Sequence, residues 1–595
     1  MNPIEKNHSI GGFFLIEPIG TYPIYTREQF SDEHNEIEQM VREFAQGRIH
    51  EEKEEIEKFN KELSLKLIRE AGELGLLGID IPEEYGGMEL DKITTAIVAE
   101  AFMNGGCASF LVTWSVQTGI GSLPIVWFGT PEQKKKYLPK LVTGEWIGAY
   151  GLTEPSAGSD ALSGKTRAEL TEDKKHYKLN GEKIFITNGG WADVYIVFAQ
   201  VDGDKFSAFI VDRDTPGFEI GAEEKKMGMK GSSTTPLSFS DALVPAENLL
   251  YKIGKGATIA FNSLNMGRFK LAASDLGGSK TMVRESVRYA LERKQFGQAI
   301  TNFDVIKGKF ADMVIRCYAA DSMIYRTIGY IQEEINLLDK SDPDYFIHVG
   351  EAMERYAVET SMTKIYGSET SAICADHGVQ ILGGYGFIEE YQIAGAYRDT
   401  RIDRIWEGTN EINRQIITGY MMKKALMEEL PIRDAIQEID NFLSNLQEPE
   451  SNQILSREAQ AIECGKRLAL FLFHEALCRF GQDLKHEQQL TEILADIFTE
   501  IYTAESTIAR VQQTKESNTL DQTTVSVAKV YSAEVCLKLL NFALTGLNGI
   551  YRAHLPESII DHLRKFQINL LLPTDIIGLK RTIAEKAYAK KDYPF

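Results

Sequence analysis

A chain of 595 residues is too long for one hydrophobic core, and its length predicts roughly three to four domains. With 43% apolar and 25% charged residues, the composition is that of a soluble globular protein and excludes disordered, fibrous and membrane-spanning classes. The formal net charge of −21 argues against a nucleic-acid binder, which needs a basic face, but leaves room for a local basic pocket that holds a small anion.

The cysteines and histidines indicate neither a disulfide framework nor a metal site. Six cysteines are scattered along the chain without a Cys-x-x-Cys pair, and the ten histidines show no metal-ligand spacing. This pattern fits a reducing compartment. No secretory signal opens the sequence, and no apolar run approaches the ~18 residues needed to span a bilayer. We therefore expect a cytoplasmic protein, with peripheral membrane contact left open.

The first predicted domain, residues 1–147, is helical. Apolar side chains recur there at the three- and four-residue spacing of a helix face, as at Ile37, Met40, Val41 and Phe44. The segment 80–87 interrupts this pattern with a proline and paired glycines, which mark a break between helices.

The second predicted domain, residues 148–257, has the periodicity of β-strands. The segment 177–186 contains two short strand-like runs around Asn180-Gly181, and Asn-Gly is the strongest short signal for a hairpin. Further strand-like runs follow at 194–198 and 206–211. Glycine and proline punctuate the whole segment, which favours short strands joined by turns.

Helical periodicity returns in the third predicted domain, residues 258–426, with a break at 341–344. A fourth helical region fills 427–595. It ends in a basic stretch that contains Lys580, Arg581, Lys586, Lys590 and Lys591. We interpret this stretch first as a solvated helix face, and second as a contact for a membrane surface or a partner. No Gly-x-Gly-x-x-Gly motif joins a strand to a helix, which argues against a Rossmann enzyme.

Four segments carry residue types that suit binding or catalysis. Residues 150–160 combine glycines with hydroxyl side chains, among them Thr153 and Ser159, that can approach a flat ring or a phosphate. Phe185 and Thr187, two apart on a predicted strand, would share one face, where they could stack on and hydrogen-bond an aromatic cofactor. Taken alone, each of these segments is more often an ordinary loop or strand end.

The third segment, residues 380–387, places glycines at a helix terminus, where they make room for a phosphate, although a simple helix cap is the commoner meaning. The fourth segment follows a cluster of arginines and sets Glu407 between Trp406 and Gly408. A carboxylate beside an apolar group can have its pKa raised and act as a base. By default, however, a lone glutamate is a salt-bridge partner.

In their order and sequence these segments resemble the acyl-CoA dehydrogenase family. The signature Gly-Leu-Thr-Glu-x-x-Ala-Gly-Ser-Asp is complete from Gly151 to Asp160, and Gln-x-x-Gly-Gly-x-Gly-Phe is present from Gln380. The resemblance covers about residues 30–425. It implies an α+β fold, mostly α, with an N-terminal helical domain, a central β-barrel-like domain and a C-terminal four-helix bundle. An additional C-terminal helical domain follows here.

The same resemblance implies an FAD site. It assigns the lining of the flavin and the acyl-CoA to Tyr150, Leu152, Thr153 and Ser159, with Phe185 on the ring and Thr187 at its N5 edge. It assigns the flavin pyrophosphate of a neighbouring subunit to Arg293, in one segment with Gln295, and to the run from Gln380 through Gly383 and Gly384. It assigns the adenine end to Thr409 and Asn410, and the substrate site to Ser159, Arg268 and Gly408.

Glu407 occupies the position of the catalytic base in most of that family. Some branches place the base one residue before the arginine of an earlier motif, and that residue here is Gly267, which has no side chain. The resemblance implies that Glu407 removes the pro-R α-proton of an acyl-CoA while the β-hydride passes to the flavin. The product would be a trans-2-enoyl-CoA, as in the first step of fatty-acid β-oxidation, and electrons would pass to an electron-transfer flavoprotein.

The region from about 427 onward resembles the very-long-chain branch of the family, as does the sequence Gly267-Arg268-Phe269. We therefore expect a long-chain substrate, a homodimer rather than the usual tetramer, and peripheral membrane association. Two positions depart from the family pattern. Gly395 stands where the second signature expects Lys or Arg, and Phe185 stands where many relatives have Trp.

Two alternatives stay open. An acyl-CoA oxidase shares the fold but reoxidises its flavin with oxygen, although such relatives are usually longer. A non-catalytic respiratory assembly protein would use the same fold without the reaction, but the intact base and flavin segments argue against a purely structural role.

Overall fold

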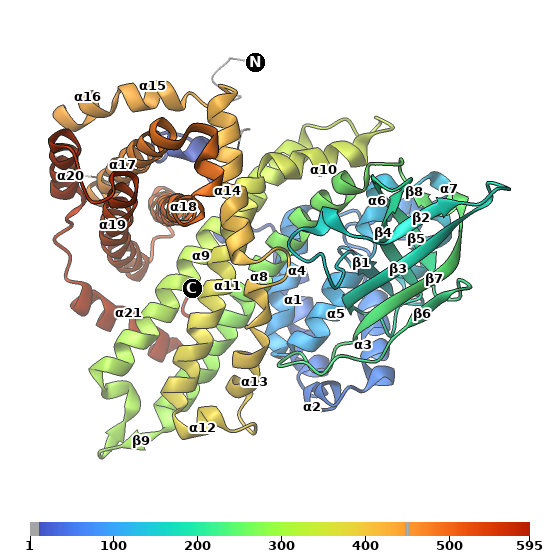
Figure 1. Ribbon diagram of the computed structural model, residues 1–595. Helices are drawn as coiled ribbons and strands as arrows, with labels where there is room; N and C mark the ends of the chain where they lie inside the picture. Colours follow the sequence, from blue (N-terminus) through green and yellow to red (C-terminus); the bar gives the residue numbers. More distant parts are fainter. Residues whose placement is uncertain (1–10, 447–448, 450–452) are drawn as a thin grey trace.

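The computed structural model describes residues 11–446, 449 and 453–595. The first ten residues of the predicted 1–147 domain, and a few residues of the predicted 427–595 domain between 447 and 452, lie outside the described residues. In Figure 1 a bundle of long helices occupies the centre, with the sheet and the N-terminal helices on one side and the C-terminal helices on the other. This mostly helical arrangement with one central sheet confirms the predicted fold class.

The helices before the sheet include the predicted amphipathic one. They are α1 (Asp32–Phe44), α2 (Lys53–Glu57), α3 (Lys61–Glu73), α4 (Lys92–Phe102), α5 (Ala108–Gln117), α6 (Leu123–Phe128) and α7 (Pro131–Val142). In α1, Val41 and Phe44 are buried, and the Ser31 hydroxyl caps the helix by accepting from the backbone N–H of His34 at 3.1 Å. The predicted break at 80–87 falls between α3 and α4 and contains a short 3-10 turn.

The central domain is an eight-stranded sheet in the described part of the chain. Its strands are β1 (Gly148–Gly151), β2 (Arg167–Leu170), β3 (His176–Thr187), β4 (Val194–Val201), β5 (Lys205–Asp212), β6 (Phe218–Ile220), β7 (Thr234–Pro245) and β8 (Leu249–Leu250). They are ordered β6-β7-β3-β2-β4-β5-β8, and β1 pairs with β4 in parallel. Because α5 packs against β1 and β3, the sheet and the N-terminal helices meet at the start of β1.

Asn180-Gly181 does not form the predicted hairpin. β3 runs through this dipeptide as one strand that pairs with β2 on one side and β7 on the other. The register shifts between Leu179 and Gly181, and Gly181 has a φ of 147°. A β-carbon there would lie 2.5 Å from Thr166 Oγ1. The glycine therefore marks a bulge with a close neighbour rather than a turn.

A second irregularity in β3 sets the position of Phe185. The register shifts again between Lys183 and Ile186, and Phe185 has a φ of 59°. The expectation that Phe185 and Thr187 share one face rested on regular alternation, which this bulge breaks. Both side chains nevertheless line the same cavity, and the Phe185 residue is 62% exposed.

The bundle is built from the long helices α8 (Gly256–Glu292), α9 (Asp304–Asn336), α11 (Ala357–Leu382) and α14 (Asn410–Leu426). α11 packs against α8, α9 and α14, and α4 packs against α8 from the N-terminal side. The connecting elements are the strands β9 (Lys294–Gln295) and β10 (Gln298–Ala299) and the helices α10 (Tyr345–Arg355), α12 (Gly384–Phe387) and α13 (Gln392–Asp399). The predicted break at 341–344 separates α9 from α10, which confirms it.

The C-terminal region adds a further layer of helices. They are α15 (Ile432–Gln437), α16 (Ile439–Ser444), α17 (Ser456–Phe480), α18 (Gln488–Glu516), α19 (Gln522–Tyr551), α20 (Glu557–Leu570) and α21 (Ile576–Lys590). α18 packs against α9 and α14, and α21 packs along α9 (Figure 1). α19 is long and apolar enough to span a membrane, with a mean hydropathy of 1.2, but 56% of that stretch is buried among its neighbours. The helix packs against α17, α18, α20 and α21 of the same region.

The basic stretch of α21 makes ion pairs within the chain. Lys580 pairs with Asp312 and Glu534, Arg581 with Asp304, and Lys586 with Asp521. Asp304 and Asp312 belong to α9, so these contacts attach α21 to the bundle. The stretch is therefore in part an internal contact, which leaves less basic charge for a membrane surface or a partner than the sequence suggested.

A buried ion cluster joins three parts of the chain. Asp321 of α9 is 1% exposed, and it pairs with Arg27 at 3.0 Å, with Arg510 of α18 at 3.1 Å, and with Lys280 of α8. Burial alone would raise the pKa of Asp321, but these cations hold it well below its usual range. Arg27 and Lys280 also pair with Glu100 of α4. The cluster therefore connects the N-terminal helices, the bundle and the added C-terminal region.

Candidate active site

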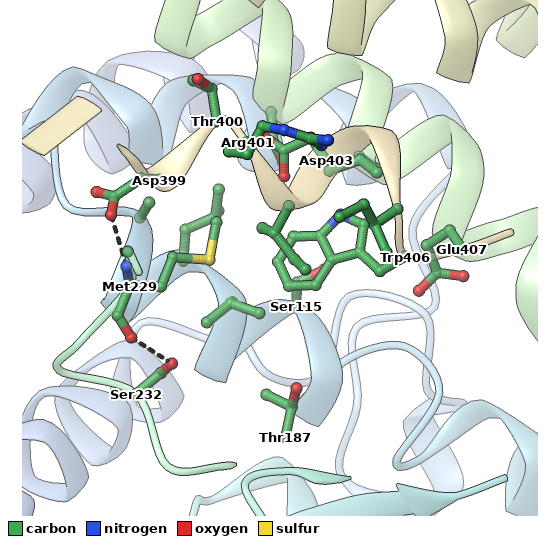
Figure 2. Close-up of a pocket in the computed structure, with 18 of the residues that line it drawn as sticks. Ser115, Thr187, Met229, Ser232, Asp399, Thr400, Arg401, Asp403, Trp406 and Glu407 are labelled. Atoms are coloured by element: carbon green, nitrogen blue, oxygen red, sulfur yellow. Dashed lines mark hydrogen bonds between the residues drawn. The ribbon is translucent and has the colours of Figure 1, made fainter. Parts of the chain in front are cut away.

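A cavity of about 960 Å³ lies where α5, the sheet, α8 and the segment before α14 meet (Figure 2). Many predicted site residues line it, namely Tyr150, Leu152, Thr153, Ser159, Phe185, Thr187, Arg268, Glu407, Gly408 and Thr409. A second cavity, of about 480 Å³, is lined by the predicted residues Arg293, Gln295, Gly383 and Gly384. Gln380 and Asn410 line neither of these two cavities.

Glu407 stands in the loop before α14 with a φ of 54°. This left-handed conformation is costly for a glutamate and persists only where the surroundings impose it. Its carboxylate lies directly over α8, because a β-carbon at Gly267 would be 2.5 Å from Glu407 Oε2. The Oε2 atom is buried and has no hydrogen-bond partner among the described residues. The two candidate base positions thus compete for one space, and a glycine at 267 leaves that space to Glu407.

Side chains of the bundle hold the carbonyl groups of this loop. Arg268 Nε and Asn413 Nδ2 each donate to the carbonyl oxygen of Glu407 at 3.3 Å. Lys364 Nζ of α11 donates to the carbonyl oxygen of Gly408 at 2.8 Å. These hydrogen bonds fix the strained backbone on which the carboxylate depends. Sequence reasoning did not find Asn413 or Lys364.

Burial and the nearby positive charges shift the pKa of Glu407 in opposite directions. Burial raises the pKa of Glu407 to about 7, although the nearby cations Arg268, Lys364 and Lys270 oppose the shift. Burial also lowers the pKa of Lys364 and of Lys270 to about 8, and that of Arg268 to about 10. A carboxyl group with a pKa near neutrality can accept and release a proton, as a general base must. The available sequence signal for Lys364 was a lone charge inside the uncharged helical run 360–368.

The wall of the cavity presents hydrogen-bonding groups suited to a flat heteroaromatic ligand. Tyr150 Oη and Trp406 Nε1 are buried and have no partner among the described residues. The hydroxyl-bearing residues Thr153, Ser159 and Thr187 line the same cavity. This set fits the flavin ring of FAD, which carries several nitrogen and oxygen atoms that need partners.

The predicted adenine contacts already have structural roles. Thr409 Oγ1 accepts from the backbone N–H of Ile412 at 3.2 Å and caps α14. Asn410 Oδ1 accepts from Lys364 Nζ at 2.8 Å, and Asn410 Nδ2 donates to Ser368 Oγ at 3.1 Å. Thr409 still borders the main cavity, whereas the Asn410 amide is buried inside the bundle.

The second cavity lies at the far end of α8. Arg293 caps that helix, and its guanidinium carbon lies 5.3 Å from the ring centroid of Tyr385. Arg293 is 25 residues beyond Arg268, a rise of about 37 Å, so the two cavities are well separated. Gly383 has a φ of 64° and ends α11, and the next residue, Gly384, begins the four-residue helix α12. The C-terminal end of the long helix α11 does not favour a phosphate there, and Arg293 supplies positive charge.

Family models match four segments of the chain. They are acyl-CoA dehydrogenase, N-terminal domain, over residues 31–145; acyl-CoA dehydrogenase, middle domain, over 149–242; and acyl-CoA dehydrogenase, C-terminal domain, over 254–422 and again, by a separate model, over 465–555. The first three matches cover the N-terminal helices, the sheet and the bundle. The fourth falls in the added C-terminal region.

Relatives match the chain over different lengths. A Bacillus subtilis (strain 168) protein named probable acyl-CoA dehydrogenase is 43% identical over 595 residues, which cover 98% of both chains. The crystal structure of an acyl-CoA dehydrogenase complexed with FAD from Bacillus anthracis is 41% identical, with a TM-score of 0.95 over 98% of this chain and 100% of that one. The mitochondrial very long-chain specific acyl-CoA dehydrogenase of Macaca fascicularis is 35% identical over 68% of this chain and 60% of that protein. The two bacterial relatives therefore share the added C-terminal region.

Proposed function

The chain belongs to the acyl-CoA dehydrogenase family, and from this membership we propose that it uses FAD to convert long-chain acyl-CoA into trans-2-enoyl-CoA. The observation that carries the proposal is the Glu407 carboxyl group. It borders the main cavity, its Oε2 atom is unpaired, and burial raises its pKa to about 7. The FAD bound to the Bacillus anthracis relative supports the cofactor. When bound, FAD supplies the acceptor for the β-hydride.

Glu407 and the residues that hold its loop perform the proton transfer and stabilise the charge that develops on the substrate. Glu407 takes the pro-R α-proton, and its own backbone N–H donates to the thioester oxygen, where negative charge develops. Arg268, Asn413 and Lys364 bind the carbonyl groups of the same loop and so keep the carboxylate and the N–H in a fixed relation. A site closed to water strengthens these interactions.

The rate of flavin reduction by acyl-CoA is expected to rise with pH through about 7, because only the ionised Glu407 carboxylate accepts a proton. One pH unit below the pKa about a tenth of the carboxyl groups are ionised, so the rate constant should be about tenfold lower there than one unit above it. Anaerobic stopped-flow measurements at saturating acyl-CoA test this profile, with FAD retention checked at each pH. A rate that is flat, or that falls, across neutrality would contradict Glu407 as the base.

Gly267→Ala is expected to slow flavin reduction by roughly tenfold to a hundredfold while leaving FAD bound. Its β-carbon would meet the Glu407 carboxylate at 2.5 Å, so the carboxylate must move away from the α-carbon of the substrate. Single-turnover reduction rates and the FAD content of the purified variant measure the two effects.

Gly419→Ala on α14 is the matched control. A β-carbon at Gly419 meets no atom within 4 Å, so this change should preserve the reduction rate and stabilise the exposed helix by about 0.5–1 kcal/mol. If Gly267→Ala keeps the rate of the parent protein, the carboxylate does not act from the position over Gly267.

The shape of the main cavity supports a long acyl chain. Residues of α8 that line it recur on one helix face, namely Phe261, Leu264, Gly267, Arg268, Leu271, Ser274, Asp275, Gly278, Thr281, Met282 and Glu285. From Gly267, beside the base, to Glu285 the helix rises by about 27 Å. Anaerobic titration with saturated acyl-CoAs of increasing length tests the preference. The highest efficiency should fall among long chains, and an optimum at butyryl-CoA would contradict it.

The proposal extends to assembly and electron transfer. The second cavity, with Arg293 remote from the base along α8, suits the pyrophosphate of an FAD bound to another copy, which supports a homodimer. We place the reaction in the cytoplasm, as the first step of fatty-acid β-oxidation, with an electron-transfer flavoprotein as acceptor. Light scattering tests the dimer. Hydrogen peroxide formed in equal amount to enoyl-CoA, without any protein acceptor, would indicate an oxidase instead.

A further inference from the structure

A pair of buried carboxyl groups lies in the wall of the main cavity. Asp275 of α8 is 5% exposed, Asp403 is 4% exposed, and both residues line the cavity. Asp275 Oδ2 and Asp403 Oδ1 are fully buried and have no hydrogen-bond donor among the described residues. In Figure 2 Asp403 and Glu407 lie on different sides of the Trp406 indole. The pair is therefore a second polar feature of the cavity, apart from the base.

The two carboxyl groups lie close enough for each to shift the pKa of the other. Burial raises the pKa of Asp275 to about 7 and that of Asp403 well above its usual range, and the Asp275 carboxyl group adds to the rise at Asp403. Two carboxyl groups can hydrogen-bond only when they share a proton. The nearby cation, Lys364, already donates to the Gly408 carbonyl and to Asn410 Oδ1. Both residues line the cavity, so the carboxyl oxygens that are not fully buried can bond a ligand there.

Other polar groups on the same helix face are already bonded. Ser274 Oγ donates to the carbonyl oxygen of Lys270 at 2.8 Å, and Thr281 Oγ1 donates to that of Met103 at 3.0 Å. A saturated acyl chain lying along this face would cover the carboxyl pair without giving it a hydrogen bond, which is unfavourable for buried polar groups. The cavity wall thus favours an acyl chain that carries a polar group beside Asp275 and Asp403.

We propose, resting on the function proposed above, that the preferred acyl-CoA carries a hydroxyl group on its chain, which hydrogen-bonds with Asp275 and Asp403. A hydroxyl group both donates and accepts, so it matches a carboxyl pair that shares one proton. An ammonium group fits less well, because its charge would have to be buried in a largely apolar cavity.

The helix α8 sets the position of this hydroxyl group. Asp275 stands eight residues beyond Gly267, which lies against the base, and this separation is a rise of about 12 Å. An extended chain advances about 1.2 Å per bond, as a peptide backbone does, so the hydroxyl belongs roughly ten bonds from the α-carbon. The compound 12-hydroxydodecanoyl-CoA meets this requirement.

The test compares 12-hydroxydodecanoyl-CoA with dodecanoyl-CoA in the FAD-loaded protein. We expect the hydroxylated ester to reduce the flavin with an efficiency about tenfold higher, because it alone satisfies the carboxyl pair. Calorimetry with Glu407→Gln protein, which binds without turnover, should show a similar ratio of affinities.

The double variant Asp275→Leu, Asp403→Leu should reverse the preference, and the double variant with Asn at both positions should retain part of it. Asp376→Leu, on the exposed surface of α11, is the matched control.

The outcomes separate the two proposals. Equal efficiencies for the two esters in the parent protein would overturn the hydroxyl preference, as would a preference that survives in the double Leu variant. If neither ester reduces the flavin, the proposed reaction fails, while calorimetry still decides whether the hydroxylated chain binds more tightly. Should the Leu variant not fold, a weakened preference in the double Asn variant against the Asp376→Leu control decides the same point.

Discussion

Glu407→Gln is expected to slow flavin reduction by acyl-CoA about a hundredfold to ten-thousandfold, the range that a general base contributes. Glutamine keeps the shape of the side chain over Gly267 but cannot accept the α-proton. FAD content and acyl-CoA affinity should change little, because Arg268 and Asn413 bind the backbone carbonyl at 407 rather than its side chain. Anaerobic stopped-flow reduction, with FAD content and acyl-CoA affinity determined in parallel, measures all three.

The matched control is Glu411→Gln, in the first turn of α14 and exposed to solvent. It removes one carboxylate from the same part of the chain without touching the cavity, so the reduction rate should equal that of the parent. A rate for Glu407→Gln within a few-fold of the parent would show that another group removes the proton. Loss of FAD in that variant would show instead that the carboxylate supports cofactor binding.

Asp321→Asn is expected to destabilise the protein by about 3–5 kcal/mol, the usual cost of removing one partner from a buried ion pair. The variant leaves Arg27, Lys280 and Arg510 buried with less compensating charge. Because the cluster joins three regions, the loss should appear in the unfolding of the whole chain rather than of one domain. Urea denaturation followed by circular dichroism measures it.

Asp312→Asn on the same helix is the comparison. Its carboxylate pairs with Lys580 at 2.6 Å, but the side chain is 36% exposed, so water compensates for the lost pair. A surface pair of this kind contributes about 0–1 kcal/mol. Equal destabilisation by the two variants would mean that the buried cluster holds the regions together no better than a surface contact does.

The local spacing of apolar residues predicts much of the fold, because it indicates which side chains must be buried. The apolar stripe ending at Phe44 predicts α1, and the Pro-containing break at 341–344 separates α9 from α10. The Asn180-Gly181 hairpin was wrong because its signal is local, whereas the chain needs glycine there to pass Thr166 of a neighbouring segment. No short sequence window contains that contact.

In the active site, too, local sequence predicts some residues, while the roles of others depend on contacts between distant segments. Motifs predicted Glu407 and several of the other residues that line the main cavity, since a motif is recognised from residue type and spacing alone. Lys364, Asp275 and Asp403 each look like ordinary charged residues, and their roles arise only because α8, α11 and the loop before α14 converge. Likewise the sequence shows that Gly267 has no side chain, while the fold shows that this absence is what admits the Glu407 carboxylate.

The length of α8 has a genetic consequence. In the proposed dimer a copy with Glu407→Gln still offers Arg293 to its neighbour, and a copy with Arg293→Ala still offers Glu407, which lies against Gly267 toward the other end of α8. Two alleles that are each inactive should therefore complement one another when expressed together, since one site in every mixed dimer retains both residues. Two alleles that both alter Glu407 should not complement one another. Changes at Glu407 and changes at Arg293 would therefore define two complementation groups within a single gene.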